Sequence, residues 1–203
     1  MLDAKLRPLI DPALNRAGAW LAAQGVKADA VTIVGIIVGL MAAAAIYQSA
    51  YGVGIALVLG GRLLDGLDGA VARATSRSAF GGYLDIVGDF IFYVSVPVAF
   101  GLAHPPNLAP ALVLVASFAL TGVSFLAFAA VAAEQGLETD NHGEKSFFYS
   151  TGLAEGAETI LAFLLMCLFP QNFAAIALAF AALCGLTVIQ RTLMAWRMFN
   201  RKQ

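Results

Sequence analysis

Hydrophobic positions along this chain form long blocks that are separated by short polar segments. Six largely apolar stretches cover roughly residues 31–48, 51–75, 79–103, 108–133, 151–169 and 172–197. A helix that crosses a bilayer needs about 20 predominantly apolar residues, and in lipid a helix satisfies its own backbone polar groups. The pattern therefore predicts an all-α, polytopic membrane protein with six transmembrane helices.

The first 26 residues follow a different pattern, in which apolar residues recur at helical spacing with charged residues between them. The apolar positions are Leu6, Leu9, Ile10, Leu14, Ala17 and Leu21. This pattern is typical of an amphipathic helix that lies in the membrane interface, and a poorly ordered tail is the alternative. We expect an interfacial amphipathic helix over residues 1–26 and a transmembrane domain over residues 27–203.

The composition agrees with a membrane protein. Hydrophobic residues make up 60% of the chain and charged residues 12%, and the mean hydropathy is +0.82. Soluble domains are roughly 45–50% apolar. No stretch is left for a separate soluble domain, so we expect membrane lipids as neighbours and no nucleic-acid partner.

Basic residues are distributed unevenly over the connections. The connections around 48–50, 104–110 and 170–172 contain no Lys or Arg. Arg62 lies inside the second stretch, and the other basic residues lie before the first stretch or near the remaining connections and the C-terminus. By the positive-inside rule, both termini and the active site are expected to be cytoplasmic. The expected location is a bacterial inner membrane.

Four aspartates interrupt the second and third apolar stretches: Asp65, Asp68, Asp85 and Asp89. A carboxylate near the bilayer centre costs about 2.5 to 3.5 kcal/mol, so these four need compensation. Residues three or four apart share one face of a helix, and both pairs lie ~12 to 20 Å from a turn near Ser76. We expect the pairs to face each other at the same depth.

Carboxylate oxygens in this number suit a hard divalent cation. Mg²⁺ or Mn²⁺ is the expected cofactor, and two carboxylate pairs have the ligands for two ions. Mg²⁺ commonly binds carboxylates together with substrate phosphates, which indicates a phosphate-bearing substrate. Small residues around the aspartates, such as Gly69, leave room for a ligand, and Arg73 is a candidate phosphate clamp.

Two runs of sequence carry a family resemblance. Residues 65–73 read Asp-Gly-Leu-Asp-Gly-Ala-Val-Ala-Arg, and residues 81–89 read Gly-Gly-Tyr-Leu-Asp-Ile-Val-Gly-Asp. Together they resemble the signature of the CDP-alcohol phosphatidyltransferases, D-x2-D-G-x2-A-R followed by G-x3-D-x3-D. Seven residues separate Arg73 from Gly81, which is shorter than the usual spacer of the family. This departure leaves the role of residues 75–80 open.

The resemblance covers the chain in outline and implies an activity. Members of the family have six membrane helices, usually preceded by an interfacial helix, and often form homodimers. A CDP-linked lipid donor, commonly CDP-diacylglycerol, gives its phosphatidyl group to a small alcohol acceptor and releases CMP. The chain is thus expected to be a transferase of phospholipid biosynthesis.

The resemblance also implies roles for particular residues. Asp65, Asp68 and Asp85 would bind metal, and Asp89 would complete the metal site and act as the general base. The expected CDP-binding residues are Thr32, Asp65, Asp68, Gly69, Ala72, Arg73 and Gly81. Thr32 could instead bond its own backbone.

The acceptor site is less well defined. Its candidate residues, chosen for their position beside the metals on the cytoplasmic side, are Lys145, Tyr149, Glu155, Glu158 and Arg191. Because only two of these residues are basic, Lys145 and Arg191, the site is compatible with a neutral or amine-bearing alcohol. The two glutamates would equally be explained by ion pairs with Arg191 and Lys145, so the identity of the acceptor stays open.

Two alternative functions use the same aspartates. One is a CDP-aminoalcohol:diacylglycerol phosphotransferase, because the metal site would hold the CDP diphosphate in either reaction. The more distant one is a divalent cation transporter, because intramembrane carboxylates often mark ion pathways. Transporters commonly contain internal repeats, and no second half of this chain repeats the aspartate pairs.

Overall fold

The computed structural model of the chain describes residues 2–136 and 153–200, with side chains from residue 10 onward. In chain order the elements are α1 (Leu2–Ala23), α2 (Ala28–Tyr47), α3 (Tyr51–Ala74), α4 (Ala79–Ala103), η1 (Pro105–Asn107), α5 (Leu108–Glu134), α7 (Gly156–Leu168), η2 (Pro170–Asn172) and α8 (Phe173–Phe199). These described ranges contain no strand. The all-α prediction is confirmed.

Four helices are long and apolar enough to cross a membrane. They are α2, α4, η1 with α5, and η2 with α8. The helix α3 has 24 residues but carries the charged side chains of the site, and α7 has 13 residues. The expected bounds of the second, third and fourth apolar helices agree closely with α3, α4 and α5.

The fifth helix is shorter than expected. The prediction began it at residue 151, but residues 153–155 are not helical and α7 begins at Gly156. The reason is that the backbone N–H groups of Leu153 and Ala154 donate to the Thr187 hydroxyl, at 3.1 and 3.0 Å. These bonds tie the segment to α8 instead of continuing a helix.

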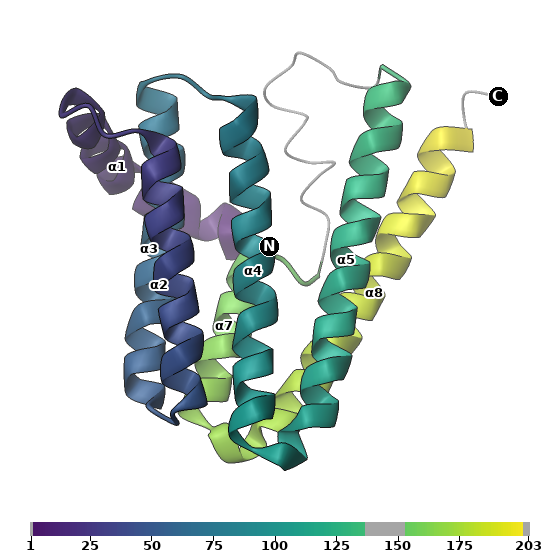
Figure 1. Ribbon diagram of the computed structural model, residues 1–203. Helices are drawn as coiled ribbons and strands as arrows, with labels where there is room; N and C mark the ends of the chain where they lie inside the picture. Colours follow the sequence, from purple (N-terminus) through teal and green to yellow (C-terminus); the bar gives the residue numbers. More distant parts are fainter. Residues whose placement is uncertain (1, 137–152, 201–203) are drawn as a thin grey trace.

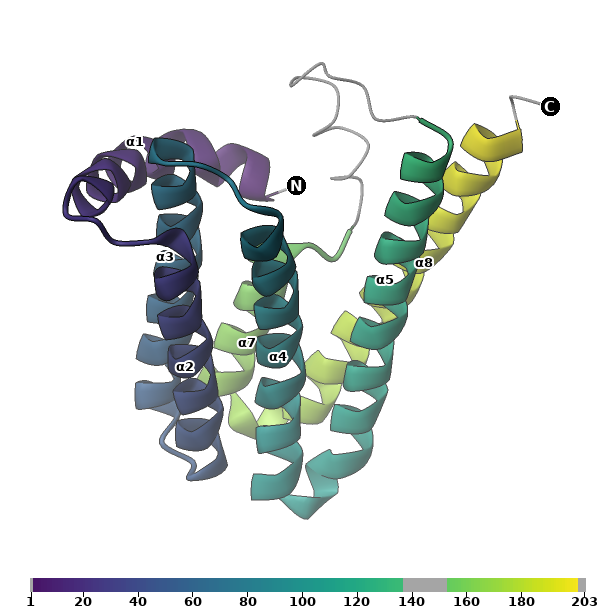
Figure 2. The ribbon, with the colours of Figure 1, turned by 45° about the horizontal axis from the view of Figure 1, so that its top comes forward.

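The helices form a bundle with two different ends (Figure 1). The helices α2, α3 and α4 form one group, α5 and α8 form a second, and α7 contacts both α3 and α8. Short connections at residues 48–50, 104–107 and 169–172 meet at what we call the far end. The turn at residues 75–78 lies at the opposite end, and Figure 2 shows α1 lying across that end. We call it the α1 end.

The hydrophobic core lies toward the far end. The rings of Phe100 and Phe173 stack there with centroids 4.6 Å apart, and nearer the aspartates Phe92 and Phe163 meet edge to face at 5.4 Å. Cys167 and Cys184 are both buried in this cluster, as expected for packing residues. Most of the large side chains of the core are therefore placed away from the aspartates.

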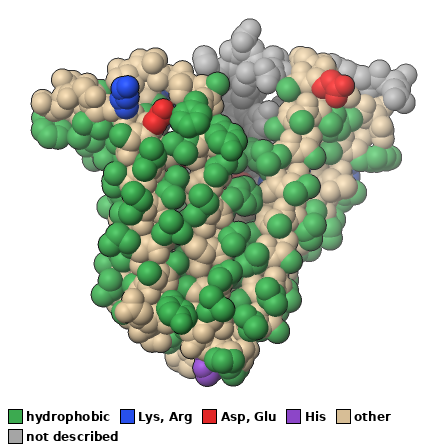
Figure 3. All heavy atoms as spheres, in the orientation of Figure 1, with side chains coloured by type: hydrophobic (Ala, Val, Ile, Leu, Met, Phe, Trp, Pro, Cys, Tyr) green, Lys and Arg blue, Asp and Glu red, His purple; other side chains and the backbone are tan. Residues whose placement is uncertain are grey.

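The surface is apolar along the length of the bundle. Figure 3 shows hydrophobic side chains over most of this face, while the Lys, Arg, Asp and Glu side chains in view gather near the α1 end. Exposed large side chains occur on all the long helices, for example Met41 at 52%, Leu120 at 62% and Leu186 at 50% exposure. Such a belt suits contact with lipid.

The helix α1 packs closely on the part of α3 that carries the aspartates. A Cβ at Gly18 would lie 2.6 Å from Cβ of Ala70, and a Cβ at Gly66 would lie 2.7 Å from Cδ1 of Leu14. Small residues at a crossing let two helix backbones approach. The α1 helix is thus a direct support of the segment between Asp65 and Arg73.

We expect Gly18→Ala to destabilise the protein. The added methyl group would meet the backbone of Ala70 and Val71 within 3 Å, and overpacking of this kind costs about 1 to 3 kcal/mol. The matched control is Gly185→Ala, because Gly185 lies in α8 and no atom lies within 4 Å of the place that its Cβ would take. Thermal unfolding in detergent should show a lower Tm for Gly18→Ala alone, and equal Tm values would contradict the tight crossing.

Candidate active site

The aspartates lie on two helices that are held apart by a third. Both α3 and α4 pack mainly on α2 rather than on each other. On the α4 side this packing is tight, since a Cβ at Gly39 would lie 3.1 Å from the Phe92 ring and one at Gly88 would lie 2.9 Å from Cγ1 of Ile36. The carboxylates of α3 and α4 consequently face each other across a gap.

Three of the four carboxylates converge. Asp65, Asp68 and Asp85 each offer an oxygen, and these oxygens all lie within 4.8 Å of one another. Asp68 is buried and Asp85 is exposed, so the group extends from the bundle interior to its surface. The expected meeting of the two pairs at one depth is therefore found for Asp65, Asp68 and Asp85, but Asp89 is not part of this group. The oxygen donors and their spacing fit a divalent cation.

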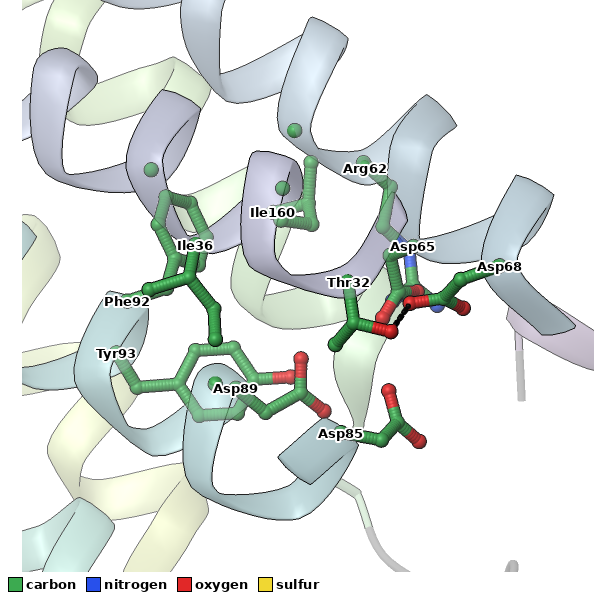
Figure 4. A pocket seen from close by; sticks show the side chains of 14 residues that line it. Thr32, Ile36, Arg62, Asp65, Asp68, Asp85, Asp89, Phe92, Tyr93 and Ile160 are labelled. Atoms are coloured by element: carbon green, nitrogen blue, oxygen red, sulfur yellow. Dashed lines mark hydrogen bonds and ion pairs between the residues drawn. The ribbon is translucent and has the colours of Figure 1, made fainter. Parts of the chain in front are cut away.

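The convergent carboxylates border a small inner cavity of about 50 Å³ (Figure 4). Asp65, Asp68, Asp85 and Asp89 all line it, together with apolar side chains of α2, α4 and α7. The turn at residues 75–78 connects α3 and α4 as expected.

Thr32 holds the buried carboxylate. Its hydroxyl lies 2.7 Å from Oδ2 of Asp68 and 3.1 Å from the carbonyl oxygen of Ala28. The bond to its own backbone, one of the alternatives left open by the sequence, is therefore present, together with a contact to Asp68. The side chain of Thr32 orients Asp68 toward Asp65 and Asp85.

Asp89 lies one turn deeper than Asp85 and is not one of the three convergent carboxylates. It is half-buried, and the phenol oxygen of Tyr93 points toward it (Figure 4). Asp89 and Tyr93 line both the inner cavity and a further cavity between α4, α5, α7 and α8. The position of Asp89 therefore connects the carboxylate group with that second space.

An outer cavity of about 310 Å³ opens beside the carboxylates at the α1 end. Six of the seven expected CDP-binding residues line it, namely Thr32, Asp68, Gly69, Ala72, Arg73 and Gly81; Asp65 lines the inner cavity instead. Ser76, Arg77 and Ser78 of the turn also line the outer cavity. The shortened spacer thus contributes a wall of the same space.

Two contacts shape the outer cavity. Asn15 of α1 accepts hydrogen bonds from Nη2 and Nε of Arg73, at 2.9 and 3.2 Å, which fixes the guanidinium. Ser78 caps α4 by accepting a bond from the N–H of Gly81 at 2.8 Å. A Cβ at Gly81 would lie 2.9 Å from both the Ser78 hydroxyl and the Asp29 carboxylate, so only glycine fits there without a shift.

The cavity between α4, α5, α7 and α8 has a volume of about 290 Å³. Among the expected acceptor residues, Glu155 and Arg191 line it and Glu158 does not. Glu155 precedes α7 with an extended backbone, whereas Glu158 lies in the first turn of α7. Lys145 and Tyr149 lie outside the described residues.

Arg191 is anchored to α5. Its Nη1 donates to the carbonyl oxygen of Thr121 and to the Ser124 hydroxyl, both at 2.8 Å. Its guanidinium carbon lies 5.6 Å from the ring centroid of Phe125. The cation is therefore fixed at the wall of the cavity that Asp89 also lines.

Some site residues were not found from the sequence. Arg62 donates from Nη1 to Oδ2 of Asp65, and Tyr93 approaches Asp89. Both lie one turn beyond an aspartate on the same helical face, so extending the spacing of three or four residues would have found them. No local pattern marks Asn15, which reaches the site through the packing of α1 on α3.

The fold and the cavities are those of an integral membrane enzyme, with carboxylates grouped between two polar spaces. A family model described as CDP-alcohol phosphatidyltransferase matches residues 26–198. The chain belongs to the CDP-alcohol phosphatidyltransferase family and is a phosphatidyltransferase. The resemblance found in residues 65–89 is confirmed, and membership of an enzyme family sets the transporter hypothesis aside.

Two relatives match over different lengths. The inner membrane protein YnjF of Escherichia coli K12 is 44% identical over 192 residues, which cover 94% of this chain and 93% of that protein. The archaetidylinositol phosphate synthase of Pyrococcus horikoshii is 40% identical over 102 residues, about half of either chain. The first match and the four long apolar helices identify an integral membrane protein.

Solved structures share the fold. Phosphatidylinositol phosphate synthase of Mycobacterium tuberculosis with CDP-DAG bound has a TM-score of 0.71 at 22% identity, covering 90% of this chain and 93% of that one. The same enzyme in complex with manganese and citrate also gives a TM-score of 0.71 at 22% identity, over 90% and 88% of the two chains.

We expect Thr32→Val to destabilise the metal-free protein. Valine keeps the shape of threonine but removes the hydroxyl that lies 2.7 Å from Asp68, and a hydrogen bond to a charged group contributes about 1.5 to 3 kcal/mol. Thr192→Val is the control, because the Thr192 hydroxyl bonds only the carbonyl of Val188 in its own helix among the described contacts. Thermal unfolding without divalent cations should give a lower Tm for Thr32→Val, and a Tm equal to that of the control would contradict this role.

Proposed function

We propose that this protein transfers a phosphatidyl group from CDP-diacylglycerol to a small alcohol and releases CMP, with Mg²⁺ or Mn²⁺ at the aspartates. The observation that carries the proposal is the convergence of three carboxylate oxygens within 4.8 Å, between one cavity suited to a nucleotide and one suited to an acceptor. Family membership supports the reaction type.

The outer cavity is the proposed CDP site. The guanidinium of Arg73, which is held in place by hydrogen bonds to Asn15, is proposed to bind a phosphate of CDP. Gly69 and Ala72 leave the wall open for the nucleotide, and Thr32 and Asp68 connect this space to the inner cavity. The M. tuberculosis enzyme of the same fold binds CDP-DAG, which supports this donor.

Asp65, Asp68, Asp85 and Asp89 are the proposed metal ligands, and we propose two ions. Four carboxylates lining one small cavity repel one another unless cations lie between them. Manganese in the complex of the M. tuberculosis enzyme supports a divalent cation here. When bound, such ions neutralise the diphosphate and hold the reacting phosphorus for in-line attack.

Asp89 is the proposed general base. It lines both the inner cavity and the cavity proposed for the acceptor, so it can accept the hydroxyl proton as the acceptor oxygen attacks phosphorus. The new bond joins that oxygen to the phosphatidyl phosphorus, and the bond from this phosphorus to the CMP oxygen breaks. Tyr93 is proposed to orient the Asp89 carboxylate.

The proposed acceptor is a small polar alcohol bound between Asp89, Glu155 and Arg191. Arg191 suits an anionic group on the acceptor, and Glu155 suits a hydroxyl or an amine. Both enzymes whose names state a product form an inositol phosphate lipid, so inositol phosphate belongs among the alcohols to be tested. Lys145 and Tyr149 remain proposed acceptor residues.

For the membrane placement we propose six spans, with α3 and α7 completing the four long apolar helices. In Figure 1 α3 runs between the two ends of the bundle, and the shorter α7 runs beside it from the far end over part of that length. The α1 end carries Lys27, Arg73 and Arg77 near its connections, so the positive-inside rule favours a cytoplasmic α1 end and termini.

We also propose that residues 1–26 form an interfacial segment and that residues 27–203 form the catalytic domain. The protein is further proposed to be a homodimer in a bacterial inner membrane.

The direct test is CMP release by the purified protein in detergent. CDP-diacylglycerol is supplied with and without Mg²⁺ or Mn²⁺, together with glycerol 3-phosphate, serine, inositol, inositol phosphate or choline. We expect metal-dependent CMP release with one acceptor. No release with any of them would favour a CDP-aminoalcohol donor, which the same assay tests with CDP-choline and diacylglycerol.

Asp85→Asn is the matched variant for this assay. The change keeps the size of the side chain but removes the charge of one of three convergent ligands, and we expect at least about a hundredfold loss of turnover. Unchanged thermal stability serves as the control for folding. Activity near that of the unchanged protein would contradict the metal assignment.

Arg191→Met tests the proposed acceptor cavity. Methionine fills similar space without the guanidinium, so we expect KM for the acceptor to rise by about tenfold or more while KM for CDP-diacylglycerol changes little. Arg197→Met, at an exposed position near the end of the same helix, is the control. An equal rise in KM for both substrates would contradict a separate acceptor cavity.

A further inference from the structure

Arg62 is a charged side chain that the proposed reaction does not use. It lies on α3 one turn from Asp65, on the side away from the 75–78 turn, and pairs with that aspartate through Nη1. Its side chain is one-third exposed. The residue precedes the signature segment, which begins at Asp65.

The apolar surroundings of Arg62 make burial of its charge energetically unfavourable. Arg62 lines the inner cavity together with the four aspartates, Thr32 and Tyr93. The rest of the wall is apolar and consists of glycines, Ile36, Phe92 and Ile160 (Figure 4). A cation at membrane depth is tolerated where it is paired or reaches water. Arg62 is directed at Asp65 in Figure 4, so its place is tied to the carboxylates.

The charges lining this cavity do not balance. Four carboxylates and one guanidinium line it, and Arg62 is its one basic side chain among the described residues. The group is therefore negative without divalent cations and becomes positive with two of them. A bound diphosphate, which is anionic, would more than offset this positive charge.

We propose that Arg62 is an internal counter-ion that lowers the affinity of the nucleotide-free protein for divalent cations. In the metal-free protein it compensates Asp65 and lowers the repulsion among the carboxylates. With metal present it repels the cations, so they bind tightly only when the anionic diphosphate is bound as well. This inference rests on the proposed function, because it requires the metal site.

The size of the expected effect follows from Coulomb's law. At an effective dielectric constant near 20, a unit charge within about 5 Å of a divalent cation changes its affinity by at least about tenfold. The anionic diphosphate attracts the cations and raises their affinity through its own charge. The charge of Arg62 should therefore appear in the affinity of the nucleotide-free protein for the cation.

The test measures Mn²⁺ affinity in detergent, with and without cytidine diphosphate. Free Mn²⁺ is followed by electron paramagnetic resonance, and Mn²⁺ held by the nucleotide alone is subtracted from a protein-free titration. Arg62→Met and Arg62→Gln remove the charge, the second while keeping a hydrogen-bond donor for Asp65. Arg62→Lys keeps the charge, and Arg197→Met removes an exposed charge far along α8.

We expect Mn²⁺ alone to bind at least about tenfold tighter to Arg62→Met and Arg62→Gln than to the unchanged protein. Cytidine diphosphate should strengthen Mn²⁺ binding both to the unchanged protein and to these variants, because the attraction comes from its own negative charge. Arg62→Lys and Arg197→Met should behave like the unchanged protein. The metal-free Tm should fall in Arg62→Met and recover on adding Mn²⁺.

Two outcomes would overturn the inference, and they differ. Unchanged or weaker Mn²⁺ binding in Arg62→Gln, beside an unchanged protein that does bind Mn²⁺, would give Arg62 a structural role only and leave the proposed function standing. No saturable Mn²⁺ binding to the unchanged protein, with or without the nucleotide, would remove the metal site, and the proposed function would fail together with the inference.

Discussion

Mutual repulsion of carboxylates within a largely apolar bundle is the constraint on which the rest of this structure depends. Four aspartates line one small cavity, and like charges so close are unfavourable where water is scarce. Two contacts reduce this repulsion: the Thr32 hydroxyl donates a hydrogen bond to Asp68, and the Arg62 guanidinium forms an ion pair with Asp65. These contacts moderate the repulsion without removing the negative charge, which a site for divalent cations requires.

The backbone arrangement serves the same constraint. Because α3 and α4 both pack on α2, the side chains of their facing turns do not fill the space between them. Tight contacts such as Gly39 with Phe92 fix one wall, and the crossing of Gly18 over Ala70 fixes the other from outside. The gap between the aspartates is therefore held open by packing elsewhere, not by the charged groups themselves.

Much of this could be predicted from the sequence, because membrane helices and helical faces depend on local periodicity. The bounds of α3 and α4, the turn between them and the convergence of Asp65, Asp68 and Asp85 all followed from spacing. The start of α7 did not, because it is set by bonds to Thr187, more than 30 residues away. The contact of Asn15 with Arg73 likewise depends on how α1 docks on α3, which no pattern within either helix encodes.

The two larger cavities are supported by different parts of the bundle. Among the described residues, α2, α3, α4 and their connections line the outer cavity, whereas the 290 Å³ cavity takes most of its wall from α5, α7 and α8. Asp89 and Tyr93 of α4 are its main polar connection to the carboxylates. Substitutions on α5 or α8 can therefore reshape the second cavity without contacting Asp65, Asp68 or Asp85. A family that keeps one donor chemistry while varying the acceptor would need this division.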